Sequence, residues 1–117
     1  NYPFHKERSD LDIGLPKGMT DTAYLALLDG HLNRVLDSFE PDFMLYQSGV
    51  DVLATDKLGH LGLSLEGCKQ RDKLVLGAAH RHGIPLVASM GGGYSPHLRD
   101  IVEAHANTFR LACWYWF

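Results

Sequence analysis

The sequence has few cysteines, no long apolar run and no excess of basic residues. Cys68 and Cys113 make neither a disulfide framework nor a Cys-x-x-Cys metal site. No apolar run approaches the ~18 residues of a membrane-spanning helix. The 11 lysines and arginines are scattered among 14 acids, which argues against binding to nucleic acid or to an anionic membrane. Because no segment typical of a secretory signal opens the sequence, we expect a reduced, cytoplasmic protein.

The apolar content is high enough for one domain with a core, since 45% of the 117 residues are apolar. No repeat or low-complexity segment is present. The sequence ends in four consecutive aromatic residues, Trp114, Tyr115, Trp116 and Phe117. Exposed, such a cluster would form a large apolar surface. We therefore expect further protein to cover it, either the rest of a longer chain or an oligomer partner.

Apolar residues at helical spacing predict a helix that begins near Thr20 and ends before Pro41. The Thr20 hydroxyl is suited to cap the first turn, which also contains Asp21. Proline disfavours a helical conformation in the residue before it, so Pro41 marks the end. The expected apolar stripe consists of Tyr24, Leu28, Leu32, Val35 and Phe39.

Two further helices are predicted in the second half. One runs from Ser64 to about His82, with Gly83 as its C-terminal cap. Its inner face consists of Leu65, Cys68, Val75, Leu76 and Ala79. The other begins with Ser95 as cap and Pro96 in the first helical position. Its apolar side consists of Leu98, Ile101, Val102, His105, Phe109 and Ala112.

Residues 43–47 and 84–89 are short apolar runs, which predicts two strands buried on both faces. The order strand, helix, strand, helix is typical of a parallel pair joined by a right-handed crossover. Two strands do not make an independent sheet. The predicted fold class is therefore α/β, with this chain forming part of an open parallel sheet with flanking helices.

Ligands of such sheets bind beyond the carboxyl ends of the strands. Residues 48–51 follow the first strand and residues 90–94 follow the second. If the strands are neighbours, about 5 Å apart, Asp51 and Tyr94 can face one pocket. Taken singly, each residue has a simpler reading: Asp51 as a turn or cap residue and Tyr94 as a packing residue. Glycines 91–93 fit a positive-φ turn or an anion-binding nest.

Together these segments resemble a known family. The motifs are YQSGVD at 46–51, DKLG at 56–59, LSLEG at 63–67 and GGGY at 91–94. In order and separation they resemble the C-terminal part of the histone deacetylase superfamily, the zinc-dependent deacetylases and acetylpolyamine amidohydrolases with an arginase-like α/β fold. SDLDIGLP at 9–16 is similar to bacterial and class IV-like members. The resemblance implies that residues 1–117 are the C-terminal part of a single deacetylase domain.

The resemblance also implies roles for individual residues. Asp51 would be one of three ligands of a catalytic Zn²⁺, and the Tyr94 hydroxyl would point at the scissile amide carbonyl. Leu58 would line the mouth of the acyl-lysine tunnel, and Gly92 and Gly93 would lie near its wall. The implied reaction is hydrolysis of the acetyl or acyl group from an acetylated lysine or an acetylated polyamine amine.

The chain departs from this family in its histidines. It has no tandem histidines that would act as base and acid, and its one Asp-x-His triplet, at residues 29–31, lies inside the helix predicted between Thr20 and Pro41. His60, His80 and His82 are expected in solvent, and His105 in the core. We therefore expect the chain alone to be inactive and about two hundred upstream residues to supply the missing groups.

Two alternatives to this function remain open. One is a non-catalytic α/β module that binds a phosphorylated ligand at the glycine loop, and the other is a truncated inactive homologue.

Overall fold

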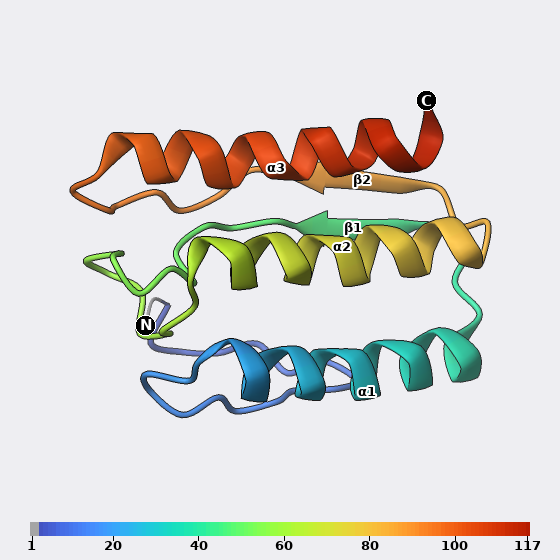
Figure 1. Ribbon diagram of the computed structural model, residues 1–117. Helices are drawn as coiled ribbons and strands as arrows, with labels where there is room; N and C mark the ends of the chain where they lie inside the picture. The colour runs from blue at the N-terminus through green and yellow to red at the C-terminus, as the bar shows by residue number, and fades with distance from the viewer. Residues whose placement is uncertain (1–2) are drawn as a thin grey trace.

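A parallel two-stranded sheet and three helices make up the computed structural model, which describes residues 3–117 (Figure 1). The order along the chain is α1 (Asp21–Phe39), β1 (Met44–Gln47), α2 (Leu65–Arg81), β2 (Leu86–Ser89) and α3 (Leu98–Trp116). β1 pairs with β2 in parallel, with Met44 opposite Leu86. α2 packs between α1 and α3 (Figure 1). The predicted parallel pairing is therefore confirmed. Residues 1 and 2 of the predicted domain lie outside the described residues.

The strands are buried on one face only, so the prediction of burial on both faces is wrong for this chain. Met44, Tyr46 and Leu86 face the helices and are partly buried. Leu45 and Val87, which are paired with each other, point the other way and are 80% and 51% exposed. Since side chains alternate along a strand, one layer of helices covers only every second residue. Within residues 3–117, no second layer covers the other face.

α1 ends where the sequence predicts, but its buried stripe differs. Val35 is exposed and Phe39 is 73% exposed, whereas Leu36 is buried against Ala78 of α2. The stripe thus continues from Leu32 with a spacing of four residues, which keeps it on the side of α1 that faces α2. The helix stops because Glu40 takes a left-handed conformation, with φ 48°.

α2 follows the prediction closely. The Ser64 hydroxyl accepts a hydrogen bond from the Gly67 N–H at 2.9 Å, and Gly83 has a φ of 65° just beyond the helix. Cys68 and Leu76 of the predicted inner face are fully buried. Capping at one end and a positive-φ glycine at the other fix both ends of the helix.

α3 begins two residues later than predicted, because His97 rather than Ser95 is its N-cap residue. The Ser95 hydroxyl instead donates to the Thr55 Oγ1 at 2.9 Å. Three residues of the predicted apolar side are exposed, namely Leu98, Val102 and Phe109. The residues that the structure buries are Ala104, His105, Asn107, Thr108 and Leu111.

The C-terminal aromatic residues lie largely at the surface. Trp114 and Phe117 are exposed, and the Tyr115 hydroxyl donates to the Lys73 carbonyl at 3.4 Å. A groove of about 460 Å³ between α3 and β2 is lined by Phe109, Trp116 and other apolar residues. The apolar surface expected from the sequence is therefore present.

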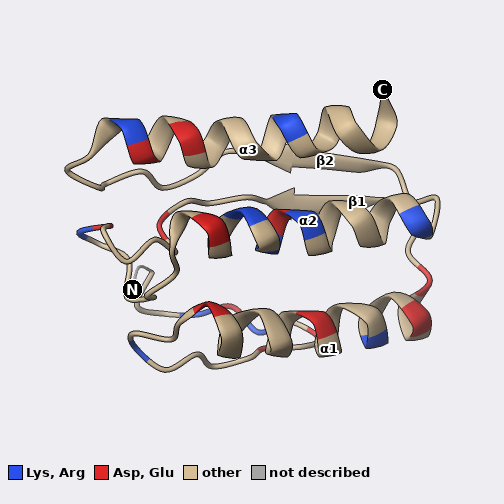
Figure 2. Cartoon of the chain, in the orientation of Figure 1, with Lys and Arg blue, Asp and Glu red and all other residues tan. Residues whose placement is uncertain are grey.

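Charged side chains of both signs lie on each helix and none on the strands (Figure 2). Within the part of the chain that the structure describes, no helix combines the length and apolar character needed to cross a bilayer.

Candidate functional site

The loops that follow β1 and β2 lie side by side because the pairing continues beyond the strands. The Ser48 N–H donates to the Ser89 carbonyl, and the Val50 N–H donates to the Gly91 carbonyl, each at 2.9 Å. Both loops therefore leave the same edge of the sheet, and this brings Asp51 next to the glycine loop.

Asp51 is packed between two glycines. A Cβ on Gly49 would lie 2.7 Å from Oδ1 of Asp51, and a Cβ on Gly92 would lie 2.7 Å from the Asp51 backbone nitrogen. Gly92 also has a φ of 68°, a conformation that other residues rarely adopt. The Asp51 side chain itself is solvent-exposed. The two glycines thus allow the carboxylate to sit against both loops while it remains accessible.

The segment 56–59 folds back onto Asp51. A Cβ on Gly59 would lie only 1.8 Å from the Asp51 carbonyl oxygen. Oδ1 of Asp56 accepts hydrogen bonds from the N–H groups of Leu58, at 2.9 Å, and Gly59, at 2.8 Å. This tight turn places the half-exposed Leu58 next to the two loops.

Tyr94 is attached to the same turn through its backbone. Its N–H donates to Oδ2 of Asp56 at 2.9 Å, and its carbonyl accepts from the Lys57 N–H at 3.4 Å. Partial burial works to raise the pKa of Asp56, but the backbone donors Gly59, Leu58, Tyr94 and Gly93 outweigh it and lower the pKa. Because Asp56 bonds to both segments, it fixes the start of the Tyr94 segment relative to Asp51. The Tyr94 side chain is 57% exposed.

The structure therefore brings all five predicted site residues to one edge of the sheet, namely Asp51, Leu58, Gly92, Gly93 and Tyr94. Among residues 3–117, no three His, Cys, Asp or Glu side chains cluster closely enough to hold a metal ion. A catalytic zinc has three protein ligands. The accessible Asp51 carboxylate fits one of those positions, and the described part of the chain does not complete a set of three.

The histidines lie where the sequence predicts. His60, His80 and His82 are exposed, although His60 shares the lining of a cavity of about 500 Å³ with Asp51. His105 is buried on α3, and its Nε2 would lie 3.9 Å from a Cβ on Gly93. Burial, and then the charge of Arg71, lower the pKa of His105, which favours a neutral core histidine.

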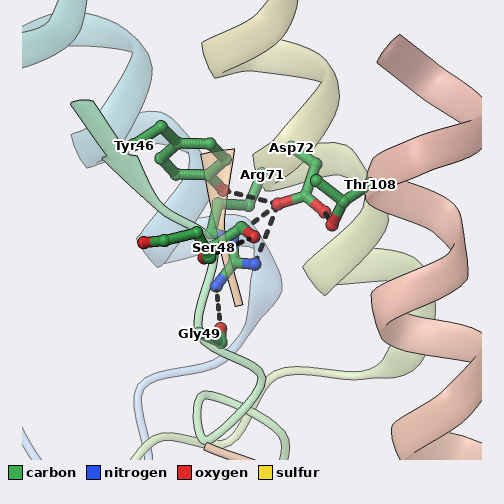
Figure 3. A network of polar contacts seen from close by, with 7 residues as sticks. Tyr46, Ser48, Gly49, Arg71, Asp72 and Thr108 are labelled. Carbon is green, nitrogen blue, oxygen red and sulfur yellow. Dashed lines mark hydrogen bonds and ion pairs between the residues drawn. The ribbon is translucent and has the colours of Figure 1, made fainter. Parts of the chain in front are cut away.

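Sequence reasoning missed a buried polar network that reaches Gly49, two residues before Asp51 (Figure 3). Arg71 and Asp72 of α2 form an ion pair at 2.8 Å, with exposed fractions of 4% and 0%. Nη1 of Arg71 donates to the Gly49 carbonyl at 2.5 Å. Tyr46 and Thr108 donate their hydroxyl protons to Asp72, at 2.5 and 2.6 Å. The available signal was an Arg–Asp pair inside the otherwise apolar inner face of the predicted helix.

The network fixes the charge states of its members. Burial raises the pKa of Tyr46, and Asp72 raises it further against the opposing effect of Arg71. Burial would lower the pKa of Arg71, but Tyr46, Cys68 and Asp72 together raise it. Tyr46 is therefore a neutral donor and Arg71 a cation at neutral pH, which suits the hydrogen bonds that they make.

Comparison with known proteins gives consistent results. Residues 4–109 match the sequence profile of the histone deacetylase domain. An uncharacterised protein of Picosynechococcus sp. is 40% identical over 112 residues, which cover 96% of this chain. Histone deacetylase 2 of Arabidopsis thaliana is 36% identical over 113 residues, which cover 93% of this chain. The chain spans only 37% and 29% of the lengths of these two relatives.

Solved structures show the same architecture. The acetylpolyamine aminohydrolase of Burkholderia pseudomallei superposes on 87% of this chain with a TM-score of 0.72, at 22% identity and over 28% of its own length. A histone deacetylase homologue complexed with SAHA superposes on 88% of this chain with a TM-score of 0.64, at 25% identity and over 31% of its length. The predicted α/β class and deacetylase-like fold are thus confirmed.

Proposed function

The chain belongs to the histone deacetylase domain family, and from this premise we propose that it contributes to a zinc-dependent amide hydrolase. In this proposal Asp51 is one zinc ligand and Tyr94 is the residue that stabilises the oxyanion. The substrate is an acetylated amine, either the side chain of an acetylated lysine or an acetylated polyamine. The remaining ligands and the general base come from protein outside this chain.

One observation supports the proposal above all others. Asp51 is the exposed carboxylate at the edge where the two loops meet, and Asp56 joins its turn to the backbone of Tyr94. A carboxylate and a tyrosine on neighbouring loops, at the carboxyl ends of parallel strands, are residue types that amide hydrolysis on a metal can use.

The residues of this chain would have distinct tasks. Asp51 would hold zinc, which when bound polarises an amide carbonyl and lowers the pKa of water. The Tyr94 hydroxyl would donate a hydrogen bond to the substrate carbonyl as negative charge develops there. Gly92 and Gly93 lack side chains and would let an extended aliphatic chain pass close to the backbone. Leu58 would contact that chain near the entrance.

The single substitutions Tyr94→Phe and Asp51→Ala test the proposal in a protein that contains the complete deacetylase domain. Loss of one oxyanion donor typically lowers the rate by about 10²–10³, so Tyr94→Phe should lower kcat by that factor while zinc stays bound. Asp51→Ala should release zinc, as measured by metal content after dialysis. Undiminished deacetylation by Tyr94→Phe would refute the role of Tyr94 in stabilising the oxyanion. Unchanged zinc content in Asp51→Ala would refute the role of Asp51 as a zinc ligand.

The rival binding of a phosphorylated ligand has less support. α3 begins at Leu98, five residues after Gly93, so its N-terminus does not directly follow the glycines. The Asp51 carboxylate also lies against Gly92, where its negative charge would repel an anion. A truncated, inactive homologue is distinguished by reading the sequence upstream of this chain, where a deacetylase requires His-His and Asp-x-His motifs.

We propose that the upstream part of the domain also covers the exposed strand face and the C-terminal aromatic residues.

A further inference from the structure

We propose that Arg71, fixed by Asp72, is a positioning residue for Asp51. Within the proposed function, Arg71 would set the orientation of a zinc ligand without touching zinc or substrate. The inference rests on that function, and its evidence is the buried network that links α2 and α3 to the loop after β1 (Figure 3).

The first link joins Arg71 to the turn that contains Asp51. Nη1 of Arg71 donates to the Gly49 carbonyl, two residues before Asp51. The Asp51 carboxylate lies over the α-carbon of Gly49, since a Cβ there would be 2.7 Å from Oδ1. A shift of the Gly49 peptide would therefore move the surface on which the carboxylate rests.

The second link prevents Arg71 itself from moving. Nε and Nη2 of Arg71 both donate to Oδ1 of Asp72, at 3.0 and 2.8 Å. Asp72 is in turn held by the Tyr46 hydroxyl from β1 and by the Thr108 hydroxyl from α3. The guanidinium is thus fixed from three elements, and its third nitrogen remains aimed at the Gly49 carbonyl.

This arrangement is more specific than a general contribution to stability. A buried ion pair is often no better for stability than apolar residues of similar volume. Residues that orient metal ligands, by contrast, typically change metal affinity by about 10- to 100-fold. The planar fork of arginine can bond to a carboxylate and a carbonyl in one fixed geometry, which the ammonium of lysine does not reproduce.

The experiment compares two variants with a control in the zinc-bound protein that contains the complete domain. The double variant Arg71→Met/Asp72→Leu removes the bond to Gly49 without leaving a buried charge unpaired. Arg71→Lys retains a cation beside Asp72. The control, Leu76→Ala, truncates a fully buried residue of the same helix that takes no part in the network. The measurements are the zinc dissociation constant, by competition with a chelator, and the melting temperature of the metal-free protein.

We expect both Arg71 variants to weaken zinc binding by about 10- to 100-fold. Leu76→Ala should lower the melting temperature at least as much as they do, with unchanged zinc affinity. Wild-type zinc affinity in either folded Arg71 variant, or an equal loss of affinity in Leu76→Ala, would overturn the inference. If Asp51→Ala also retains zinc, the proposed function fails as well. If only Asp51→Ala loses zinc, the role of Arg71 alone is refuted.

Discussion

The two loops at the candidate site are held in place by different means. The loop with Asp51 is held from the protein interior by the buried Arg71, which donates a hydrogen bond to the Gly49 carbonyl. The loop with Tyr94 is attached at its rim by Asp56, whose carboxylate is only partly buried. Both loops also continue the strand pairing, through Ser48 and Val50.

This difference indicates how firmly each side chain is oriented. Hydrogen bonds in the dry interior do not compete with water, so the Asp51 turn has one preferred geometry. The bonds of Asp56 compete with water, so the Tyr94 segment is easier to release. A metal ligand binds more tightly when its orientation is fixed before the metal arrives. The proposed role of Asp51 therefore agrees with the buried hydrogen bonds that hold its turn.

The largest effect is expected from Gly59→Ala, which acts on the Asp51 loop. The new Cβ would lie 1.8 Å from the Asp51 carbonyl oxygen, so one of the two backbones must move. We expect a loss of about 3 kcal/mol in the free energy of unfolding, at the upper end for overpacking. Gly30→Ala is the matched control, because a Cβ there meets nothing within 4 Å and lies in α1. Chemical denaturation should show no loss for Gly30→Ala, since alanine favours helix. Equal stability of both variants would contradict the tight turn.

A smaller effect is expected from Asp56→Ala, which acts on the Tyr94 loop. It removes bonds to Leu58, Gly59 and Tyr94 that are partly exposed, so we expect a loss of about 1 kcal/mol. Hydrogen exchange should also accelerate at the Tyr94 amide and remain slow at the Val50 amide.

Glu103→Gln is the control for Asp56→Ala, because it removes a carboxylate from an exposed ion pair with Arg110. It should leave the melting temperature and both amides unchanged. Equal acceleration at Val50 and Tyr94 in Asp56→Ala would mean that the two loops are not held separately.

The smallest effect is a pH dependence confined to the Tyr94 loop. The pKa of Asp56 is lowered in the folded chain, so its stabilisation is complete above the unfolded value of about 3.9 and is lost as the pH falls through the folded pKa. The stability difference between wild type and Asp56→Asn should be constant from about pH 8 to 5 and shrink below about pH 4. A difference that already shrinks between pH 7 and 5 would contradict the lowered pKa.

Much of this site was predictable from local sequence. Parallel pairing follows from the order of strands and helices, and it alone places residues 48–51 beside residues 90–94. The ends of α2 were predictable because Ser64 and Gly83 act on the backbone next to them. The predicted apolar stripes of α1 and α3 were partly wrong, since burial of Val35, Phe39 or Val102 depends on what packs there.

The sequence by itself determined the order of helices and strands, because caps, breakers and apolar spacing act within a few residues of the chain. That order in turn predicted the parallel pairing and the edge at which Asp51 and Tyr94 lie. Only the tertiary structure decided that Arg71 and Asp72 are buried and that they join Gly49 to Thr108. It also decided which strand face is covered. Burial of a charge depends on partners that are distant in sequence, and a helical pattern read along one segment contains no information about them.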